Sequence, residues 1–111
     1  MPDPITIKPW GRELLLTCND NYAAKIILIK LGHRLSLQYH ELKRETLYFV
    51  YGLAEVILGE QTILAAAGTI IEIPPKMKHR ITAVKDVMIF EVSTPELDDV
   101  IRLEDDYGRT D

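Results

Sequence analysis

Short apolar runs separated by turn residues recur along the whole chain. The runs are rich in Ile, Val, Leu, Tyr and Thr, which favour strands, and they are interrupted by Gly, Pro, Asn and Asp, which favour turns. No long segment has the apolar period of a helix. Many short strands at regular spacing predict an all-β sandwich or barrel. The expected strands are residues 14–17, 23–30, 34–40, 46–51, 54–58, 62–64, 69–73, 79–84 and 87–92.

The last part of the chain has a different pattern. Leu97, Val100, Ile101 and Leu103 are spaced as on one face of a short helix or turn. A chain of 111 residues is long enough for one packed core and too short for two. We therefore expect a single domain over residues 1–111. Its core barrel is expected at about residues 13–93 and its C-terminal tail at residues 94–111.

Composition narrows the classes of function. Hydrophobic residues make up 47% of the chain and the formal net charge is −4, so the basic face that unassisted nucleic-acid binding requires is not expected. The one cysteine, Cys18, lies in an apolar run and is expected to be a small buried side chain rather than a nucleophile. No apolar stretch reaches the roughly 18–20 residues of a membrane span, and residues 1–4 lack the pattern of a signal peptide. We expect a cytoplasmic protein with no membrane partner.

Polar side chains stand at the beginning or the end of several expected strands. In the strand at residues 34–40, Ser36, Gln38 and His40 share one face, because side chains alternate along a strand. Glu45 and His79 stand at the start of later strands and have apolar residues behind them. Polar groups at strand ends in front of an apolar interior predict a site near one mouth of a barrel.

The spacing of these side chains resembles the two sequence motifs of the metal-binding cupins. The resemblance implies a double-stranded β-helix (cupin or jelly-roll) barrel, here with a short C-terminal helix or turn. It also implies one divalent metal ion held by Gln38, His40, Glu45 and His79. Residues that match the motifs are Gly32, Gln38, His40, Glu45 and Gly52 in the first, and Gly68, Pro74 and His79 in the second.

The sequence departs from the usual cupin pattern at three positions. Gln38 stands where most of these cupins have His, Lys76 replaces the usual glycine of the second motif, and Ala83 replaces its usual asparagine. Lys76 and Ala83 occupy positions that shape a turn and a strand and do not bind the metal. The metal site is therefore expected to survive these replacements.

The donor set suits a borderline divalent ion. Two imidazoles, one carboxylate and one amide favour Zn²⁺, and Fe²⁺, Mn²⁺, Co²⁺ or Ni²⁺ also accept such donors. Taken singly, each residue has an ordinary alternative: a surface histidine, Gln38 bonded to backbone, or Glu45 paired with Lys43 or Arg44 at a surface turn. The joint spacing favours the metal site. The side chain of His33 points to the face opposite that of Gln38 and His40, and it is expected in solvent.

A closer resemblance covers nearly the whole chain. Four segments occur in the order found in the type II mannose-6-phosphate isomerase domain, which in larger relatives follows a mannose-1-phosphate guanylyltransferase domain. This family also has Gln as its first metal ligand, which accounts for Gln38. No Gly-rich nucleotide loop is present, so only the isomerase activity is expected. The matching segments are residues 8–11, 32–40, 73–80 and 102–109.

The resemblance implies interconversion of mannose 6-phosphate and fructose 6-phosphate through a cis-enediolate. A metal ion can polarise the carbonyl group and stabilise the developing oxyanion. The resemblance places an arginine for the sugar phosphate at Arg34, and arginine grips phosphate through two parallel hydrogen bonds. Further candidates for contact with phosphate or enediolate are Arg102, Arg109, Lys25 and Lys78.

The proton-transfer base has several candidates, and the pattern does not choose among them. Trp10 is open between a packing anchor and a platform for a sugar ring. The structural alternative for each charged candidate is a solvated surface position. Candidates for the base are Glu72, Glu91, Lys25 and a metal-bound water.

Two other functions stay open beside the isomerase. One is a different cupin enzyme, such as an Fe²⁺ or Mn²⁺ dioxygenase, because one fold supports many chemistries. The other is a non-catalytic module that binds a sugar phosphate. A homodimer is expected from the superfamily, and the apolar runs at residues 26–29 and 63–67 are compatible with it.

Overall fold

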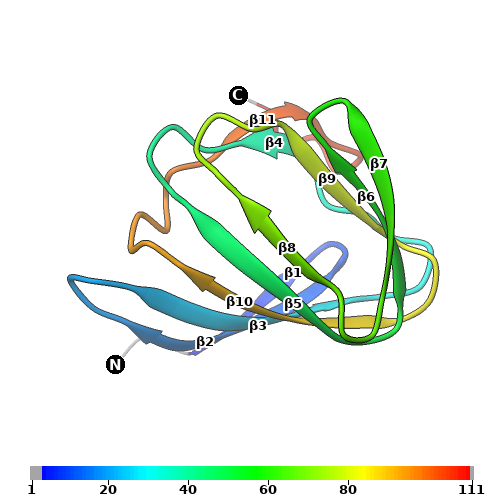
Figure 1. The fold of residues 1–111 in the computed structure, drawn as a ribbon, viewed down its shortest axis with the longest axis horizontal. Coiled ribbons are helices and arrows are strands. Elements are labelled where there is room, and N and C mark those ends of the chain that lie inside the picture. Colours follow the sequence, from blue (N-terminus) through cyan, green and yellow to red (C-terminus); the bar gives the residue numbers. More distant parts are fainter. Residues whose placement is uncertain (1–3, 111) are drawn as a thin grey trace.

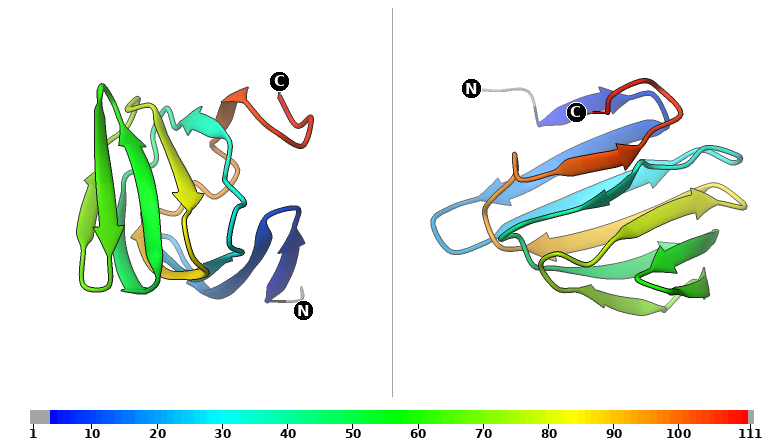
Figure 2. Two further views of the ribbon diagram at one scale, coloured as in Figure 1. Left: turned by 90° about the vertical axis from the view of Figure 1, so that its right-hand side faces the viewer. Right: turned by 90° about the horizontal axis from the view of Figure 1, so that it is seen from above.

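The computed structural model of the protein describes residues 4–110, and the regular structure in this part of the chain is all strand. The strands form two antiparallel sheets that face each other (Figures 1 and 2). In chain order they are β1 (Ile5–Lys8), β2 (Gly11–Cys18), β3 (Ala23–Ile29), β4 (Leu37–Tyr39), β5 (Glu45–Tyr51), β6 (Leu53–Leu58), β7 (Gln61–Ala66), β8 (Ile70–Ile73), β9 (His79–Ala83), β10 (Val87–Ser93) and β11 (Ile101–Glu104).

The chain passes repeatedly from one sheet to the other. The larger sheet has the order β1-β2-β3-β10-β5-β8, and the smaller has the order β11-β4-β9-β6-β7. Strands that are distant in sequence therefore become neighbours: β10 lies between β3 and β5, and β4 lies between β11 and β9. This two-sheet jelly-roll brings the ends of β4, β5 and β9 together around the space between the sheets (Figure 1).

Alternation along the strands explains the core. On β5, Leu47 and Phe49 are fully buried, whereas the intervening Tyr48 is exposed. Ile89 on β10 and Val56 on β6 fill the same interior. Burying a side chain of this size stabilises the fold by roughly 1.5–3 kcal/mol, so the inward positions specify which face of each strand points inside.

The structure confirms the all-β class and all nine expected strands, with boundaries that differ by a few residues. Two strands outside the predicted core bounds were missed, β1 and β11. The helix alternative for the tail is wrong: residues 95–100 form turns and bends, and β11 then pairs with β4. The tail forms a strand because its backbone hydrogen-bonds to the open edge of β4. The spacing of apolar residues within the tail carries no information about that edge. The sheets also face each other and do not close into one continuous barrel.

Cys18 is exposed, contrary to the prediction of a small buried side chain. It is the last residue of β2, next to the turn at residues 19–22. Among residues 4–110, no helix is long and apolar enough to cross a membrane.

Candidate metal centre

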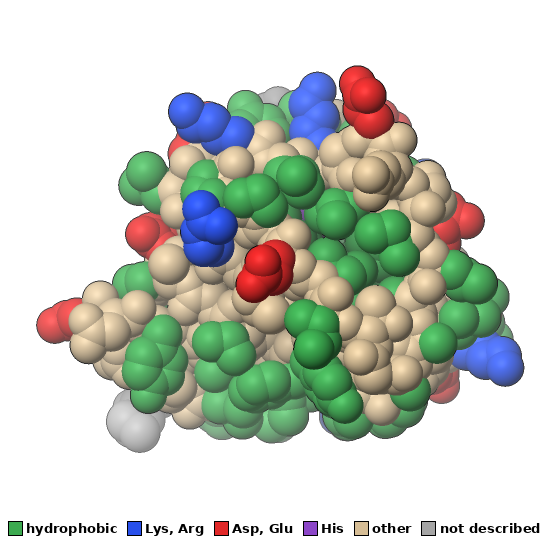
Figure 3. Space-filling model, viewed as in Figure 1, with side chains coloured by type: hydrophobic (Ala, Val, Ile, Leu, Met, Phe, Trp, Pro, Cys, Tyr) green, Lys and Arg blue, Asp and Glu red, His purple; other side chains and the backbone are tan. Residues whose placement is uncertain are grey.

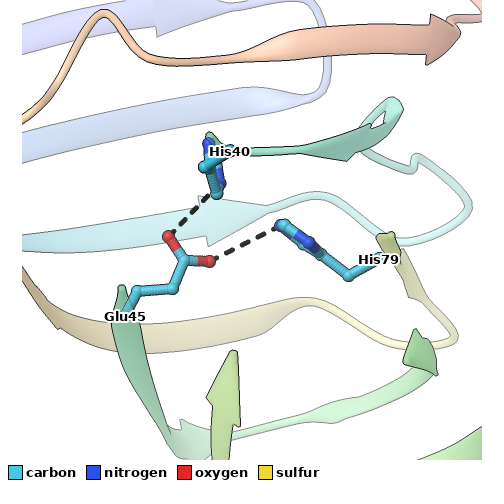
Figure 4. A group of neighbouring side chains, drawn as sticks. All are labelled: His40, Glu45 and His79. Carbon is cyan, nitrogen blue, oxygen red and sulfur yellow. Dashed lines mark ion pairs between the residues drawn. The ribbon is translucent and has the colours of Figure 1, made fainter. Parts of the chain in front are cut away.

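Three side chains at the ends of strands form a His–Glu–His cluster. His40 directly follows β4, Glu45 is the first residue of β5, and His79 is the first residue of β9. All three side chains are buried, and one possible ligand atom from each lies within 4.8 Å of the other two. The rings and the carboxylate point toward one another (Figure 4). The structure therefore brings together three of the four predicted ligands.

The carboxylate of Glu45 lies between the two imidazoles. Its Oε2 is 3.6 Å from His40 Nε2, and its Oε1 is 3.6 Å from His79 Nε2. The centres of the two rings are 5.1 Å apart. These separations leave a small space bordered by three donor atoms, which is the arrangement that a divalent ion requires.

Backbone carbonyl groups orient both imidazoles. The Nδ1–H of His40 donates to the Asp99 carbonyl, and the Nδ1–H of His79 donates to the Met77 carbonyl at 3.0 Å. A proton on Nδ1 leaves the lone pair on Nε2, and both Nε2 atoms face Glu45. The loop before β5 is held by the Asp99 carboxylate, which accepts hydrogen bonds from the backbone N–H groups of residues 41–43.

The electrostatics keep these donors in the form that binds a metal. Burial lowers the pKa of His40, and the nearby Lys43 ammonium lowers it further, so the imidazole stays neutral. Burial opposes ionisation of Glu45, but the opposing charges, Lys43 first among them, outweigh that effect and lower its pKa. His40 Nε2 is buried without a hydrogen-bond partner among the described residues. A divalent cation would satisfy that atom, so the residues fit the metal that the motifs imply.

Gln38, the fourth predicted ligand, lies beside the cluster. Its Nε2 is 3.5 Å from His79 Nε2, and its Oε1 accepts a hydrogen bond from Ser36 Oγ at 2.6 Å. Binding a metal through oxygen requires the amide to turn so that Oε1 faces the cluster. The Ser36 hydroxyl can accept as well as donate, so the turned amide keeps its partner.

A row of buried and half-buried charges continues from the cluster along the inner face of the larger sheet. Lys43 Nζ lies 3.1 Å from Glu45 Oε2 and 3.4 Å from Glu91 Oε2. Lys25 Nζ lies 3.7 Å from Glu91 Oε2 and 3.0 Å from Glu13 Oε1. Lys25 and Glu91 were predicted site residues, whereas the sequence treated Lys43 as a surface partner. Its position two residues before a predicted ligand was the available signal.

Burial has opposite consequences for the two inner members of this row. It raises the pKa of Glu91 to about 7, and the negative charge of Glu45 adds to that effect. Burial would lower the pKa of Lys43, but Glu91 and Glu45 outweigh it and raise the pKa. Lys43 is therefore a fixed cation, and Glu91 is a carboxyl group able to hold or release a proton near neutral pH.

The cluster and the charged row line one open cavity of about 100 Å³. The C-terminal tail forms one wall with Leu97, Val100, Arg102 and Arg109. Arg102 pairs with Gln38 across the β11–β4 ladder, so the tail strand places an arginine beside the candidate metal ligands.

Several predicted residues lie elsewhere. Arg34 does not line the cavity, because Asp106 holds its guanidinium through bonds of 2.6 and 2.7 Å. Glu72 and Lys78 are exposed and also lie outside the cavity lining. His33, expected in solvent, is half-buried and bonds to the Tyr107 hydroxyl at 2.9 Å. The tail supplies the partners of both Arg34 and His33. The sequence around these two residues could not predict so distant a contact.

Trp10 and Lys76 complete the frame of the site. Trp10 is 3% exposed and joins the core, and it also lines the cavity. Lys76, which replaces the usual cupin glycine, has a φ of 70°, the left-handed conformation that glycine adopts most readily. Its N–H donates to the His40 carbonyl at 2.6 Å. The turn before β9 thus keeps its shape without glycine and ties the two histidine segments together.

Solved structures share this architecture. The structure of KdgF from a Halomonas species superposes with a TM-score of 0.78 at 19% identity, covering 84% of this chain and 86% of that one. An RmlC-like cupin from Shewanella frigidimarina has a TM-score of 0.77 at 18% identity, covering 85% of both chains. The facing sheets and the His–Glu–His cluster between them define a cupin with a candidate metal site.

Within the cupins, the chain belongs to the family described as Mannose-6-phosphate isomerase C-terminal, whose model matches residues 4–105. It is 33% identical over 108 residues to xanthan biosynthesis protein XanB of Xanthomonas campestris pv. campestris, covering 93% of this chain. It is 33% identical over 107 residues to mannose-1-phosphate guanylyltransferase of Escherichia coli K12, covering 92% of this chain. The chain spans 23% and 22% of those relatives' lengths.

Proposed function

We propose that this chain is a metal-dependent sugar-phosphate isomerase that interconverts mannose 6-phosphate and fructose 6-phosphate. One observation carries the proposal. A buried His–Glu–His cluster shares a cavity with a carboxyl group whose pKa is about 7, and arginines line the same cavity. Aldose–ketose isomerisation needs a polarised carbonyl group, a proton carrier and a site for phosphate, and this cavity contains a candidate for each. Membership of the isomerase C-terminal family supports the same activity.

His40, Glu45 and His79 would hold one divalent ion, with Gln38 as a fourth ligand after its amide turns. Zn²⁺ suits two imidazoles and a carboxylate well, and Mn²⁺, Co²⁺, Fe²⁺ and Ni²⁺ accept the same donors. When bound, such an ion polarises a carbonyl group and stabilises negative charge that develops on its oxygen.

Glu91 is our candidate for the proton carrier between C1 and C2 of the sugar. It is buried and lines the cavity, where its Oε2 faces the ammonium groups of Lys43 and Lys25 at 3.4 and 3.7 Å. A base with a pKa near the working pH both accepts and releases a proton efficiently. The ionised carboxylate would take the proton from one carbon, leaving a cis-enediolate. Once the hydroxyl proton has moved between the two sugar oxygens, the acid would return its proton to the neighbouring carbon.

Lys43 would keep the pKa of Glu91 low enough for this carboxyl group to release its proton near neutral pH. Without a cation, two carboxylates on one buried face would repel each other, and Glu91 would stay protonated to a higher pH. The ammonium lies within 3.4 Å of both Glu45 and Glu91. It also lines the cavity, where it could donate to an oxygen of the enediolate.

Arg102 is our candidate for the sugar phosphate or the enediolate, in preference to Arg34. Arg102 lines the cavity, opposite Gln38 on the neighbouring strand. Arg109 and Lys8 line the cavity as well, although Arg109 is held by Asp105 through bonds of 2.8 and 2.9 Å. The role of Arg34 stays a prediction from the family resemblance.

The test is a coupled assay for fructose 6-phosphate with protein loaded with Zn²⁺, Mn²⁺ or Co²⁺. We expect turnover in the unchanged chain and at least a hundredfold lower kcat in Glu91→Gln, with metal content unchanged. Glu55→Gln is the matched control, because Glu55 is exposed on β6 and makes the same isosteric change outside the cavity.

Two outcomes would overturn the isomerase, and a third would overturn only the role of Glu91. Absence of turnover with all three metals, while calorimetry detects hexose-phosphate binding, would indicate a non-catalytic binding module. Oxygen consumption by the iron-loaded protein would indicate a cupin dioxygenase. Full activity in Glu91→Gln would remove Glu91 from the mechanism and return the base to the other cavity groups.

A further inference from the structure

Asp99 lies in the C-terminal tail and contacts the segment between two of the candidate metal ligands. Its carboxylate accepts the backbone N–H groups of residues 41–43, at nitrogen–oxygen distances of 2.7 to 3.0 Å. This segment lies between His40 and Glu45 in the chain. A single side chain of the tail therefore fixes the path of the backbone from one ligand to the next.

The backbone of the same residue holds one ligand directly. The Asp99 carbonyl accepts the Nδ1–H of His40, which leaves the lone pair on Nε2 facing Glu45. The hydrogen-bond partner of a metal-binding histidine fixes the tautomer and the orientation of its ring, and loss of that partner typically weakens metal binding about 10- to 100-fold. Asp99 thus supports the candidate metal centre twice, through its carbonyl group and through its carboxylate.

The tail that carries Asp99 is held largely by polar contacts. Every residue from 94 to 110 is at least partly exposed. The tail adds β11 to the edge of β4, and Asp106 forms an ion pair with Arg34 in which both side chains are 41% exposed. In Figure 3 charged side chains stand out along the upper edge of the surface, the side on which Figure 1 shows β4 and β11, whereas hydrophobic side chains gather on its lower part. A segment with little buried apolar surface opens locally at a lower free energy than the core strands.

We propose that Asp99 couples occupation of the metal site to docking of the C-terminal tail against β4. When the tail opens, His40 loses the partner of its Nδ1–H, and residues 41–43 lose the carboxylate. The open form therefore binds a divalent ion more weakly than the closed form. Coupling between two equilibria is reciprocal, so a bound ion holds the tail closed by the same factor. The inference rests on the metal ligands named in the proposed function and is independent of the isomerase reaction.

The coupling has a consequence for the cavity. Leu97, Val100 and Arg102 of the tail form one of its walls. An open tail removes this wall and with it the arginine beside Gln38. A metal-loaded protein would keep the wall in place for a larger fraction of the time, so the cavity would be complete when the metal is present.

The first test is hydrogen–deuterium exchange of the unchanged full chain, with saturating Zn²⁺ or with a chelator. In the chelator, the amides of β11 should exchange faster than those of the core strand β5, which report global unfolding. Saturating Zn²⁺ should slow the β11 amides at least tenfold, because a ligand suppresses an opening only if that opening weakens its binding. Amides of β11 that exchange no faster than those of β5, or that Zn²⁺ leaves unchanged, would overturn the proposal.

The second test is Asp99→Ala, with a competition titration for Zn²⁺ and the same exchange measurement. We expect the Kd to rise about tenfold or more, and the slowing of β11 exchange by Zn²⁺ to fall by the same factor. Asp98→Ala is the matched control, because Asp98 is the exposed neighbouring aspartate, and its Kd should stay within about twofold. Circular dichroism and a urea melt in the chelator verify folding. Asp99→Asn, which keeps one acceptor oxygen, should give intermediate values and replaces Asp99→Ala if that variant does not fold.

The outcomes of the second test separate coupling from simple support of the ligands. An unchanged Kd in Asp99→Ala would overturn the proposal. A raised Kd with undiminished slowing of β11 exchange would overturn it as well, because Asp99 would then hold the ligands without linking them to the tail. A chain that takes up no Zn²⁺ would overturn it together with the metal centre. Neither measurement involves a sugar phosphate, so failure of the isomerase assay is a separate result.

Discussion

The pH dependence of stability tests the reasoning about Glu91 most directly. The perturbation is Glu91→Gln, which keeps the shape of the side chain and removes its titration. Folding raises the pKa of this carboxyl group from 4.5 to about 7, because burial and the charge of Glu45 disfavour the ionised form. That difference corresponds to about 3 kcal/mol at pH values above both pKa values.

The sign follows from proton binding in the two states. Between pH 4.5 and about 7, folded protein keeps the Glu91 proton while unfolded protein has released it. Unfolding therefore releases a proton, and the unchanged protein loses stability as the pH rises through this window. Glu91→Gln lacks this loss. The free energy of unfolding of the variant minus that of the unchanged protein should rise by about 3 kcal/mol between pH 4.5 and 8.

The assay is urea unfolding of both proteins in a chelator, at half-unit steps from pH 4.5 to 8.5. Only the change of the difference with pH enters the argument, so a constant offset from altered packing has no effect. Glu55→Gln, at an exposed position, should show a flat difference. A flat difference for Glu91→Gln would refute the reasoning, because it would mean that Lys43 and Lys25 fully offset the burial of Glu91.

Three further predictions concern the metal and the backbone. His40→Ala should weaken Zn²⁺ uptake at least a hundredfold in a competition titration, whereas His33→Ala should leave it unchanged; equal uptake would remove His40 from the site. Lys76→Gly should raise the free energy of unfolding by about 0.5 kcal/mol. Relief of the left-handed φ contributes about 1–2 kcal/mol, which exceeds the cost of the added entropy of the unfolded chain. A lower urea midpoint would contradict this. Gly52→Ala should lower the free energy of unfolding by about 3 kcal/mol or more, because the new Cβ would lie 2.2 Å from a backbone oxygen. Gly59→Ala places its Cβ in open space and should lower it by about 1 kcal/mol. Equal losses of stability would show that the clash at Gly52 relaxes.

Much of the fold and the site follows from local sequence. Apolar runs with turn residues between them located nine strands, because β-propensity and turn chemistry act over a few residues. The alternation that puts Gln38 and His40 on one face is a property of any strand, and the structure has both in the cavity lining. His40, Glu45 and His79 were assigned together from motif spacing, and the structure brings them within ligand distance of one another.

What only the tertiary structure decided depends on residues far apart in the chain. Whether Lys43 is a surface partner or a buried cation depends on Glu91, 48 positions later in the chain, which reaches it only because β10 pairs with β5. Arg34 was assigned to phosphate, yet Asp106 holds it because the tail returns along β4. Pattern along a strand reports which side a residue faces. The charge and dielectric it meets there come from neighbouring strands, from the facing sheet and from the tail, and only the folded chain brings these groups together.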